Sequence, residues 1–177
     1  MALNLSNLDE KTRPLMVSEI DLDERGGQLY ISPRLNEDGR RDYPALLREA
    51  AQFHDDGWLA GEIRQRNLLR AKETRRTPSG GTTEARVPET APETLAEGEF
   101  NRFYCRAVCA RALEEGKINV RVCRAKLPVH PRPESVAKER TLIDARQLLN
   151  DLRRSQGVEP ALGIPPGPNS GLSVELP

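Results

Sequence analysis

The stretch TAPETLAEGEFNRFYCRAVCARALEEG, residues 90–116, decides the fold that we predict for this chain. It opens on Thr90-Ala-Pro-Glu93, typical of a capping box with proline in the first turn, and ends at Gly116, where a C-terminal cap is expected. Between these signals, apolar side chains surround most of the helical circumference and leave a narrow polar stripe through Arg102 and Arg106. The apolar positions are Phe100, Phe103, Tyr104, Cys105, Ala107, Val108 and Ala110. The sequence therefore predicts a central buried helix over about residues 90–115.

The segments before this helix predict a largely helical N-terminal half. Apolar periodicity indicates a first helix over about residues 6–23. A short strand over residues 28–32 and a turn over residues 36–39 follow it. Two further helices, one capped by Asp42 and one over residues 58–70, are close enough in sequence to form an αα-hairpin.

The segments after the central helix predict one strand and one more helix. Residues 117–126 alternate apolar and polar side chains, which is typical of a half-buried strand. The stretch PVHPRPES, residues 128–135, is predicted to be an irregular connection. An amphipathic helix then starts at Thr141 or Asp144 and stops near Gly157.

Together these elements predict an α+β fold with three or four helices packed on a small, mostly antiparallel sheet. Residues 1–162 are predicted to form one domain, because a chain of 177 residues has the length of a single domain. A flexible excursion at about residues 72–90 interrupts it, with at most a short strand over residues 83–87. Residues 163–177 are predicted to be a Pro/Gly-rich tail that ends in an edge strand over residues 172–176.

Composition predicts a cytoplasmic protein that is not inserted in a membrane. The chain has no apolar run of about 18 residues and no basic start followed by an apolar segment. Its three cysteines are an odd number, which favours reduced thiols over a disulfide framework.

Charge is distributed in blocks although the formal net charge is zero. Residues 1–62 carry 13 acidic and 7 basic side chains, whereas residues 63–77 carry 1 and 6. Residues 78–101 carry 5 acidic and 1 basic, and residues 102–156 carry 6 and 13. Such alternation places complementary faces either against each other within the molecule or toward partners. A net-neutral chain is not expected to bind nucleic acid indiscriminately.

Arginines on and after the central helix form the first candidate site. Arg102 and Arg106 share the polar stripe, and Arg121 and Arg124 follow on the predicted strand. Four guanidinium groups in this arrangement suit a clamp on a phosphate or carboxylate, but internal pairing with the acidic blocks is the favoured alternative. With Arg75 and Arg76 of the excursion, these four arginines are the predicted partner contacts.

A nucleic-acid-binding module is the second candidate. The predicted helix over residues 58–70 carries Arg64, Arg66 and Arg70, side chains that contact base edges and phosphates, and the basic strand 117–126 would add to the surface. Acidic residues at the start of that helix argue against this alternative, because carboxylates repel phosphates.

A metal-dependent hydrolase or nuclease is the third candidate. Cys105 and Cys109 lie one helical turn apart, and Cys123 with either His130 or His54 completes four soft ligands for zinc. Their spacing matches no zinc finger or ribbon, and buried cysteine more often acts as a small apolar residue. The sequence contains no HExxH or GxSxG motif, and we assign no catalytic residue and no cofactor.

The function that the sequence predicts is therefore binding rather than catalysis. Charge segregation and two extended segments, residues 72–90 and 163–177, are features that an isolated domain does not need. We expect a non-catalytic cytoplasmic interaction protein, an accessory subunit of a larger assembly, with a protein partner.

Overall fold

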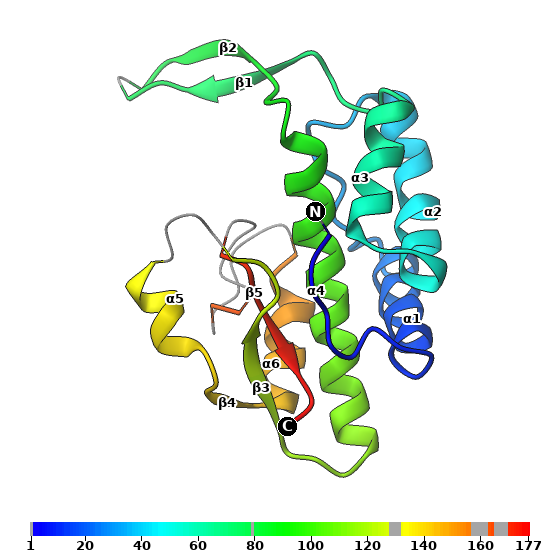
Figure 1. Cartoon of the computed structure of the whole chain (residues 1–177). Coiled ribbons are helices and arrows are strands. Elements are labelled where there is room, and N and C mark those ends of the chain that lie inside the picture. The colour runs from blue at the N-terminus through cyan, green and yellow to red at the C-terminus, as the bar shows by residue number, and fades with distance from the viewer. Residues whose placement is uncertain (1, 79, 128–131, 157–162, 165–169) are drawn as a thin grey trace.

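The computed structural model describes residues 2–78, 80–127, 132–156, 163–164 and 170–177. Helix α4 runs through the middle of the molecule and packs against helices on one side and a small sheet on the other (Figure 1). The predicted α+β class and the long central helix are confirmed. Within the described residues the helices are α1 (Thr12–Arg25), α2 (Glu37–Phe53), α3 (Asp56–Gln65), α4 (Ala91–Glu114), α5 (Pro133–Lys138) and α6 (Ala145–Arg154). The strands are β1 (Lys72–Arg76), β2 (Thr82–Arg86), β3 (Asn119–Arg124), β4 (Leu142–Asp144) and β5 (Leu172–Glu175).

Helix α4 forms the centre of the core because its buried side chains point in almost every direction. Its aromatic rings and both of its cysteines are buried, and it contacts α1, α3, α6, β3 and β5. The helix ends at Glu114, and Gly116 follows with a φ of +72°, the left-handed conformation that glycine adopts readily. The predicted capping box does not form, since the side chain of Thr90 makes no capping hydrogen bond. Packing on all sides, rather than an N-terminal cap, stabilises this helix.

Helices α1 and α3 pack on one side of α4, and α2 packs on both of them. Helix α1 begins at Thr12, later than predicted, because Asp9 accepts a hydrogen bond from the backbone N–H of Thr12 and ends the preceding turn. The predicted αα-hairpin is present as α2 and α3. The cap of α2 is Asn36 and not Asp42, so residues 36–39 open the helix instead of forming a separate turn.

Helix α3 is shorter than the predicted helix over residues 58–70. Asp55 caps its start, and the helix ends at Gln65. Asn67 then adopts a left-handed φ of +53°, which breaks the helical path, and Leu69 pairs with Leu35 in an isolated β-bridge. The apolar pair Leu68-Leu69 continues the helical periodicity of the sequence. In the structure, however, this pair lies in an extended segment that leads to β1.

The strand predicted over residues 28–32 does not form. The backbone N–H groups of Gln28 and Leu29 both donate to the carbonyl of Asp23, which holds this segment against the end of α1. Leu29 and Ile31 pack on the hydrophobic core from an irregular backbone. Alternating apolar residues here contact helices rather than a neighbouring strand.

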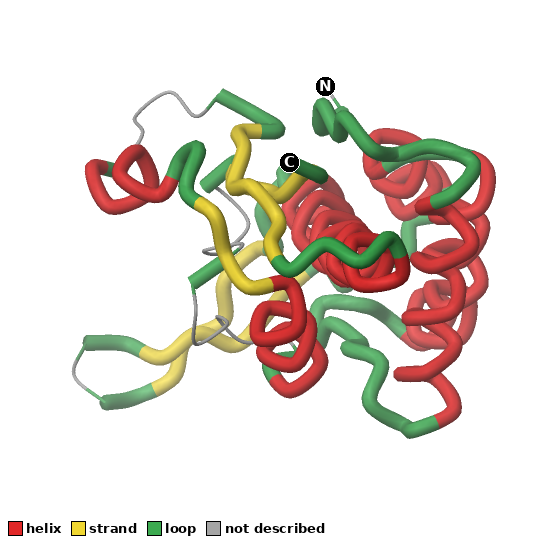
Figure 2. Tube along the Cα trace, turned by 90° about the horizontal axis from the view of Figure 1, so that it is seen from below, coloured by secondary structure: helices red, strands yellow, loops and turns green. Residues whose placement is uncertain are grey.

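The main sheet has the strand order β4-β3-β5, and both pairs are antiparallel. It lies beside α4 on the side opposite α1, α2 and α3 (Figure 2). The predictions of β3 and of an edge strand at the end of the tail are confirmed, with β5 at one edge. Of the two predicted starts of α6, Thr141 and Asp144, the structure selects Asp144, which accepts from the N–H of Gln147.

Two elements of this half were not predicted. Strand β4 was expected within the helix that follows it, and α5 starts inside the stretch predicted to be irregular. Pro133 occupies the first turn of α5, where its missing N–H is not needed, so a residue that suggested a loop instead begins a helix. Of that stretch, residues 128–131 lie outside the described part of the chain.

Strands β1 and β2 form a separate antiparallel hairpin that projects from the body between α3 and α4 (Figures 1 and 2). None of the described residues of the two strands belongs to the hydrophobic core. The predicted short strand near residues 83–87 is present as β2, and β1 pairs with it over five residues. Within the described ranges, no helix is both long enough and apolar enough to span a bilayer.

Candidate functional site

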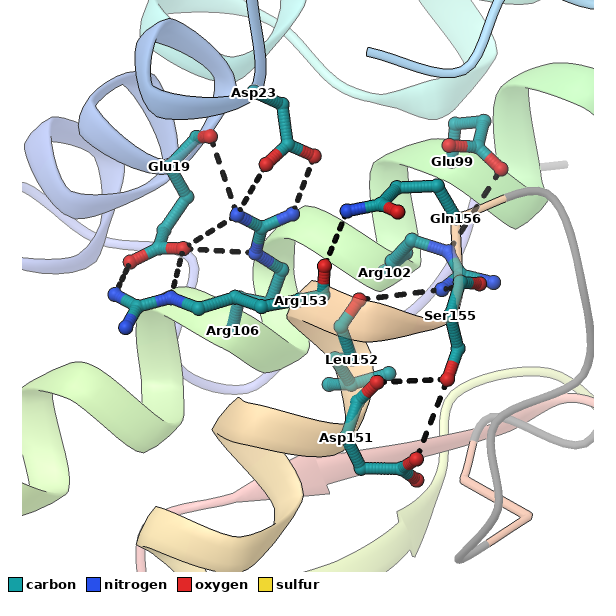
Figure 3. A network of polar contacts seen from close by, with 10 residues as sticks. All are labelled: Glu19, Asp23, Glu99, Arg102, Arg106, Asp151, Leu152, Arg153, Ser155 and Gln156. Atoms are coloured by element: carbon teal, nitrogen blue, oxygen red, sulfur yellow. Dashed lines mark hydrogen bonds and ion pairs between the residues drawn. The ribbon is translucent and has the colours of Figure 1, made fainter. Parts of the chain in front are cut away.

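Four charged side chains form an ion network between α1, α4 and α6, in which three are buried and the fourth, Arg153, is partly exposed (Figure 3). Arg106 of α4 is fully buried. Its Nε donates to Glu19 at 2.8 Å, and its two terminal nitrogens donate to the two carboxylate oxygens of Asp23 at 2.6 and 2.8 Å. Arg153 of α6 donates to both oxygens of the Glu19 carboxylate, at 2.5 and 3.0 Å, and shares Oε2 with Arg106. Two cations and two anions therefore neutralise each other, and only Arg153 reaches the surface.

Glu99 and Arg102 form a second buried pair next to this network (Figure 3). The Nε of Arg102 lies 3.9 Å from the Glu99 carboxylate, and its Nη1 donates to the carbonyls of Ser155 and Leu152 at the end of α6. Burial raises the pKa of Glu99 to about 7, and the nearby Arg102 charge only partly opposes this shift. Arg102 thus holds the end of α6 against α4.

The structure divides the six predicted partner contacts into three groups. Arg102 and Arg106 lie inside the protein, so the internal-pairing alternative describes them and they offer no surface to a partner. Arg124 is also largely buried and pairs with Glu139, whereas the half-exposed Arg121 lies 3.6 Å from Glu175 on the neighbouring strand. Arg75 and Arg76 lie on the exposed hairpin.

The three cysteines are free thiols in or near the core. Cys105 and Cys109 are fully buried, and burial raises the pKa of both thiols, that of Cys105 to about 11. Burial also raises the pKa of Cys123 to about 12. Such thiols are protonated at neutral pH and do not act as nucleophiles. In the portion of the chain that the structure describes, no group of three or more His, Cys, Asp or Glu side chains is placed to hold a metal ion, and His130 lies outside that portion.

We expect Cys105 and Cys109 to resist a thiol reagent in the native protein. Their burial blocks access, and for Cys105 the raised pKa alone lowers the thiolate fraction about a hundredfold at neutral pH. The measurement is labelling with Ellman's reagent before and after unfolding in guanidinium, with the modified positions mapped by mass spectrometry. All three thiols should react rapidly after unfolding. Rapid native labelling of Cys105 or Cys109 would show that the interior of α4 is open to solvent.

The hairpin of β1 and β2, which we call the arm, presents charged and hydroxyl side chains on both faces. Its strands carry four basic residues, Lys72, Arg75, Arg76 and Arg86, and two acidic residues, Glu73 and Glu84. At the base of the arm, Arg34 and Arg75 both pair with Glu73, at 2.5 and 2.6 Å. Arg76 and Arg86 are exposed and make no ion pair with any described residue. The arm therefore carries uncompensated positive charge beyond the body of the protein.

An open groove of about 600 Å³ lies where the arm joins the body, and we call it the arm-base groove. Residues from the end of α3, from both arm connections and from the start of α4 line it. Its lining combines apolar side chains, including Ile63, Leu69, Val87 and Pro92, with the guanidinium groups of Arg64, Arg70 and Arg86. A concave surface that mixes apolar and cationic groups suits an acidic ligand with apolar side chains.

The residues predicted for nucleic-acid binding are only partly available for such contacts. Arg64 pairs with Glu93 at 2.6 Å, and Arg66 pairs with Glu62 at 2.6 Å on its own helix. Arg70 follows α3 in the chain rather than lying on it, and its Nε donates to the carbonyl of Leu35 at 3.2 Å. The recognition helix expected over residues 58–70 is therefore not formed as one element.

The sequence analysis did not identify several residues of these sites. Glu19, Asp23 and Arg153 lie in ordinary amphipathic helices, and nothing in their local pattern distinguishes them from surface charges. Arg86 is the single basic residue of the acidic block over residues 78–101. The net charge of that block is negative, so it gives no sign of a cationic site. The one available signal was that the polar stripe of α4 is too narrow to face solvent.

Comparison with protein-family models, with curated proteins and with solved structures finds no match to this chain.

Proposed function

We propose that this protein is a non-catalytic interaction protein, an accessory subunit of a larger assembly, that contacts a protein partner through the arm. The observation that carries this proposal is that the arm extends away from the body without contributing a side chain to the core. A two-stranded hairpin is at best marginally stable alone, so an ordered arm gains most from contact with another molecule. Its two outer strand edges also offer backbone groups for strand addition.

The interior supports a structural rather than a catalytic role for the remaining polar residues. The buried arginines are held by carboxylates or backbone carbonyls of the same chain, and the three thiols have raised pKa values. Free thiols in a chain of this size are typical of a reducing compartment, which supports a cytoplasmic location.

Photo-crosslinking at one position tests this function directly. We expect a crosslinking amino acid at Thr83, an exposed residue of β2, to yield a discrete protein adduct in cells of the native host. The matched control is Gln52, an exposed residue of α2 on the body, which should yield no such adduct. Adducts are separated after parallel treatment with and without nuclease and identified by mass spectrometry.

The two treatments distinguish the classes of partner. A protein adduct that survives nuclease supports the proposal. An adduct that nuclease removes would replace it with the nucleic-acid alternative, and equal labelling from Thr83 and Gln52 would remove the arm as the binding element.

A further inference from the structure

We propose that the arm-base groove binds a partner segment in which carboxylates alternate with apolar side chains. This inference rests on the proposed function and names the chemistry of the partner. It follows from the charge of the groove and from the apolar residues in its lining.

The charge of the groove favours an anionic ligand. Arg70 and Arg86 are exposed and pair with no carboxylate among the described residues, although Arg70 donates one hydrogen bond to a backbone carbonyl. Each guanidinium therefore has N–H groups free to form a charge-assisted, bidentate hydrogen bond with a carboxylate. Arg64 also lines the groove, but Glu93 already neutralises it.

The acidic groups nearby make a peptide a better occupant than a nucleic acid. Glu89 lines the groove with the arginines, and Glu93 lies beside Arg64. A phosphate backbone presents a continuous row of negative charge and needs several uncompensated cations in line, so these carboxylates would repel it. A peptide carries separate carboxylates and can place them on Arg70 and Arg86 only.

The apolar part of the lining gives the ligand its second requirement. Leu69, Val87 and Pro88 add apolar surface to the same lining as the arginines. A wholly charged peptide would leave this apolar surface exposed to water. Successive side chains of an extended peptide point to opposite sides, so alternation brings one type of side chain to the arginines and the other to the apolar wall.

Fluorescence anisotropy with the full chain tests this proposal. The probe is a short fluorescein-labelled peptide of alternating aspartate and valine, and the comparison probes are an alternating aspartate and serine peptide, an alternating lysine and valine peptide, and single-stranded oligothymidine. We expect the aspartate and valine peptide to bind most tightly. Arg70→Glu and Arg86→Glu should each weaken its binding about tenfold or more, because each removes a charge-assisted pair and adds repulsion.

Arg146→Glu is the matched control, because Arg146 is an exposed residue of α6 outside the groove lining and its change alters the net charge equally. This variant should bind as the wild type does. Arg70→Gln and Arg86→Gln keep the test valid if a charge-reversed variant fails to fold, and they should weaken binding in the same direction.

The binding and crosslinking results together distinguish failure of the groove proposal from failure of the proposed function. Equal binding of the lysine and valine peptide, tighter binding of oligothymidine, or no effect of the groove variants would overturn the groove assignment. Crosslinking at Thr83 to a protein, together with no peptide binding, leaves the proposed function standing and rejects this inference. Peptide binding lost in the groove variants, together with no crosslinking, supports the groove at the base of the arm and rejects a contact at Thr83, farther along β2.

Discussion

Replacement of Arg106 by alanine is expected to lower the free energy of unfolding by about 3–5 kcal/mol. The guanidinium is fully buried and holds both Glu19 and Asp23, which are themselves almost completely buried. Without it, two carboxylates on α1 face the interior, and only Arg153 still contacts one of them. Uncompensated buried charge is among the few single changes that destabilise a protein this strongly.

Equilibrium urea unfolding followed by circular dichroism measures this effect. Arg48→Ala is the control, because Arg48 also pairs with two carboxylates, Asp21 and Glu24, but at a partly exposed site between α1 and α2. Its loss should lower stability by no more than about 1 kcal/mol. The variant Arg106→Met with Glu19→Gln and Asp23→Asn removes the three buried charges together, leaves only the partly exposed Arg153 charged, and should recover part of the loss. Equal effects of Arg106→Ala and Arg48→Ala would show that burial of the network does not set its energetic importance.

Glu99→Gln is expected to stabilise the protein at alkaline pH and to leave its stability nearly unchanged at pH 4. Burial raises the pKa of Glu99 from 4.5 in the unfolded chain to about 7 in the folded protein. The folded state therefore binds more protons than the unfolded state in this range, and stability falls as the pH rises from 4.5 through 7. The stabilising contribution is fully present below pH 4.5. By pH 8 the loss amounts to about 3 kcal/mol, which the glutamine variant does not suffer.

The measurement is the free energy of unfolding of the wild type and of Glu99→Gln from pH 4 to pH 8. Glu49→Gln, on the exposed surface of α2, is the control. Glu19 acts in the opposite direction and in a lower pH range. Burial alone would raise the pKa of Glu19, but hydrogen bonds from Arg153 and Arg106 outweigh it and lower the pKa below 4.5. Its contribution is lost only as the pH falls below 4.5. Parallel curves for wild type and Glu99→Gln across pH 5–8 would contradict the assignment of a neutral buried carboxyl.

The elements predicted correctly from the sequence are those with a strong local pattern. Each of these patterns lies within a single element and needs no distant partner. They are the apolar positions around α4, the alternation in β3 and the capping Asp144 at the start of α6. The central helix, the αα-hairpin and the edge strand were therefore predicted before their neighbours were known.

The wrong predictions involve patterns that suit two environments. Residues 28–32 alternate like a strand but pack on helices, and Leu68-Leu69 continues a helical period in a segment that is extended. Pro133 marks a break in the chain equally well before a loop and before a helix. In each case a tertiary contact, or the position of one turn, selected between two local possibilities.

The predicted contact arginines also fall into two groups. The environment of one group follows from its own segment, and that of the other depends on helices distant in the chain. Arg75 and Arg76 belong to a segment that is predicted to be an exposed loop because it is rich in Thr, Gly, Pro and charged residues, and both arginines are exposed. Arg102 and Arg106 were predicted partner contacts and are buried instead. Their surroundings come from α1 and α6, and Arg106 lies 87 residues from Glu19 in the chain.

The amino-acid sequence by itself determined which segment forms the centre of the core and which segments lack the apolar residues to join it. Spacing of side chains along one element is enough for that, because helix and strand periods are properties of the backbone. Only the tertiary structure decided which charges neutralise one another and which stay free for a partner. Electrostatic pairing depends on distance in space, and the pairing groups here belong to helices far apart in the chain.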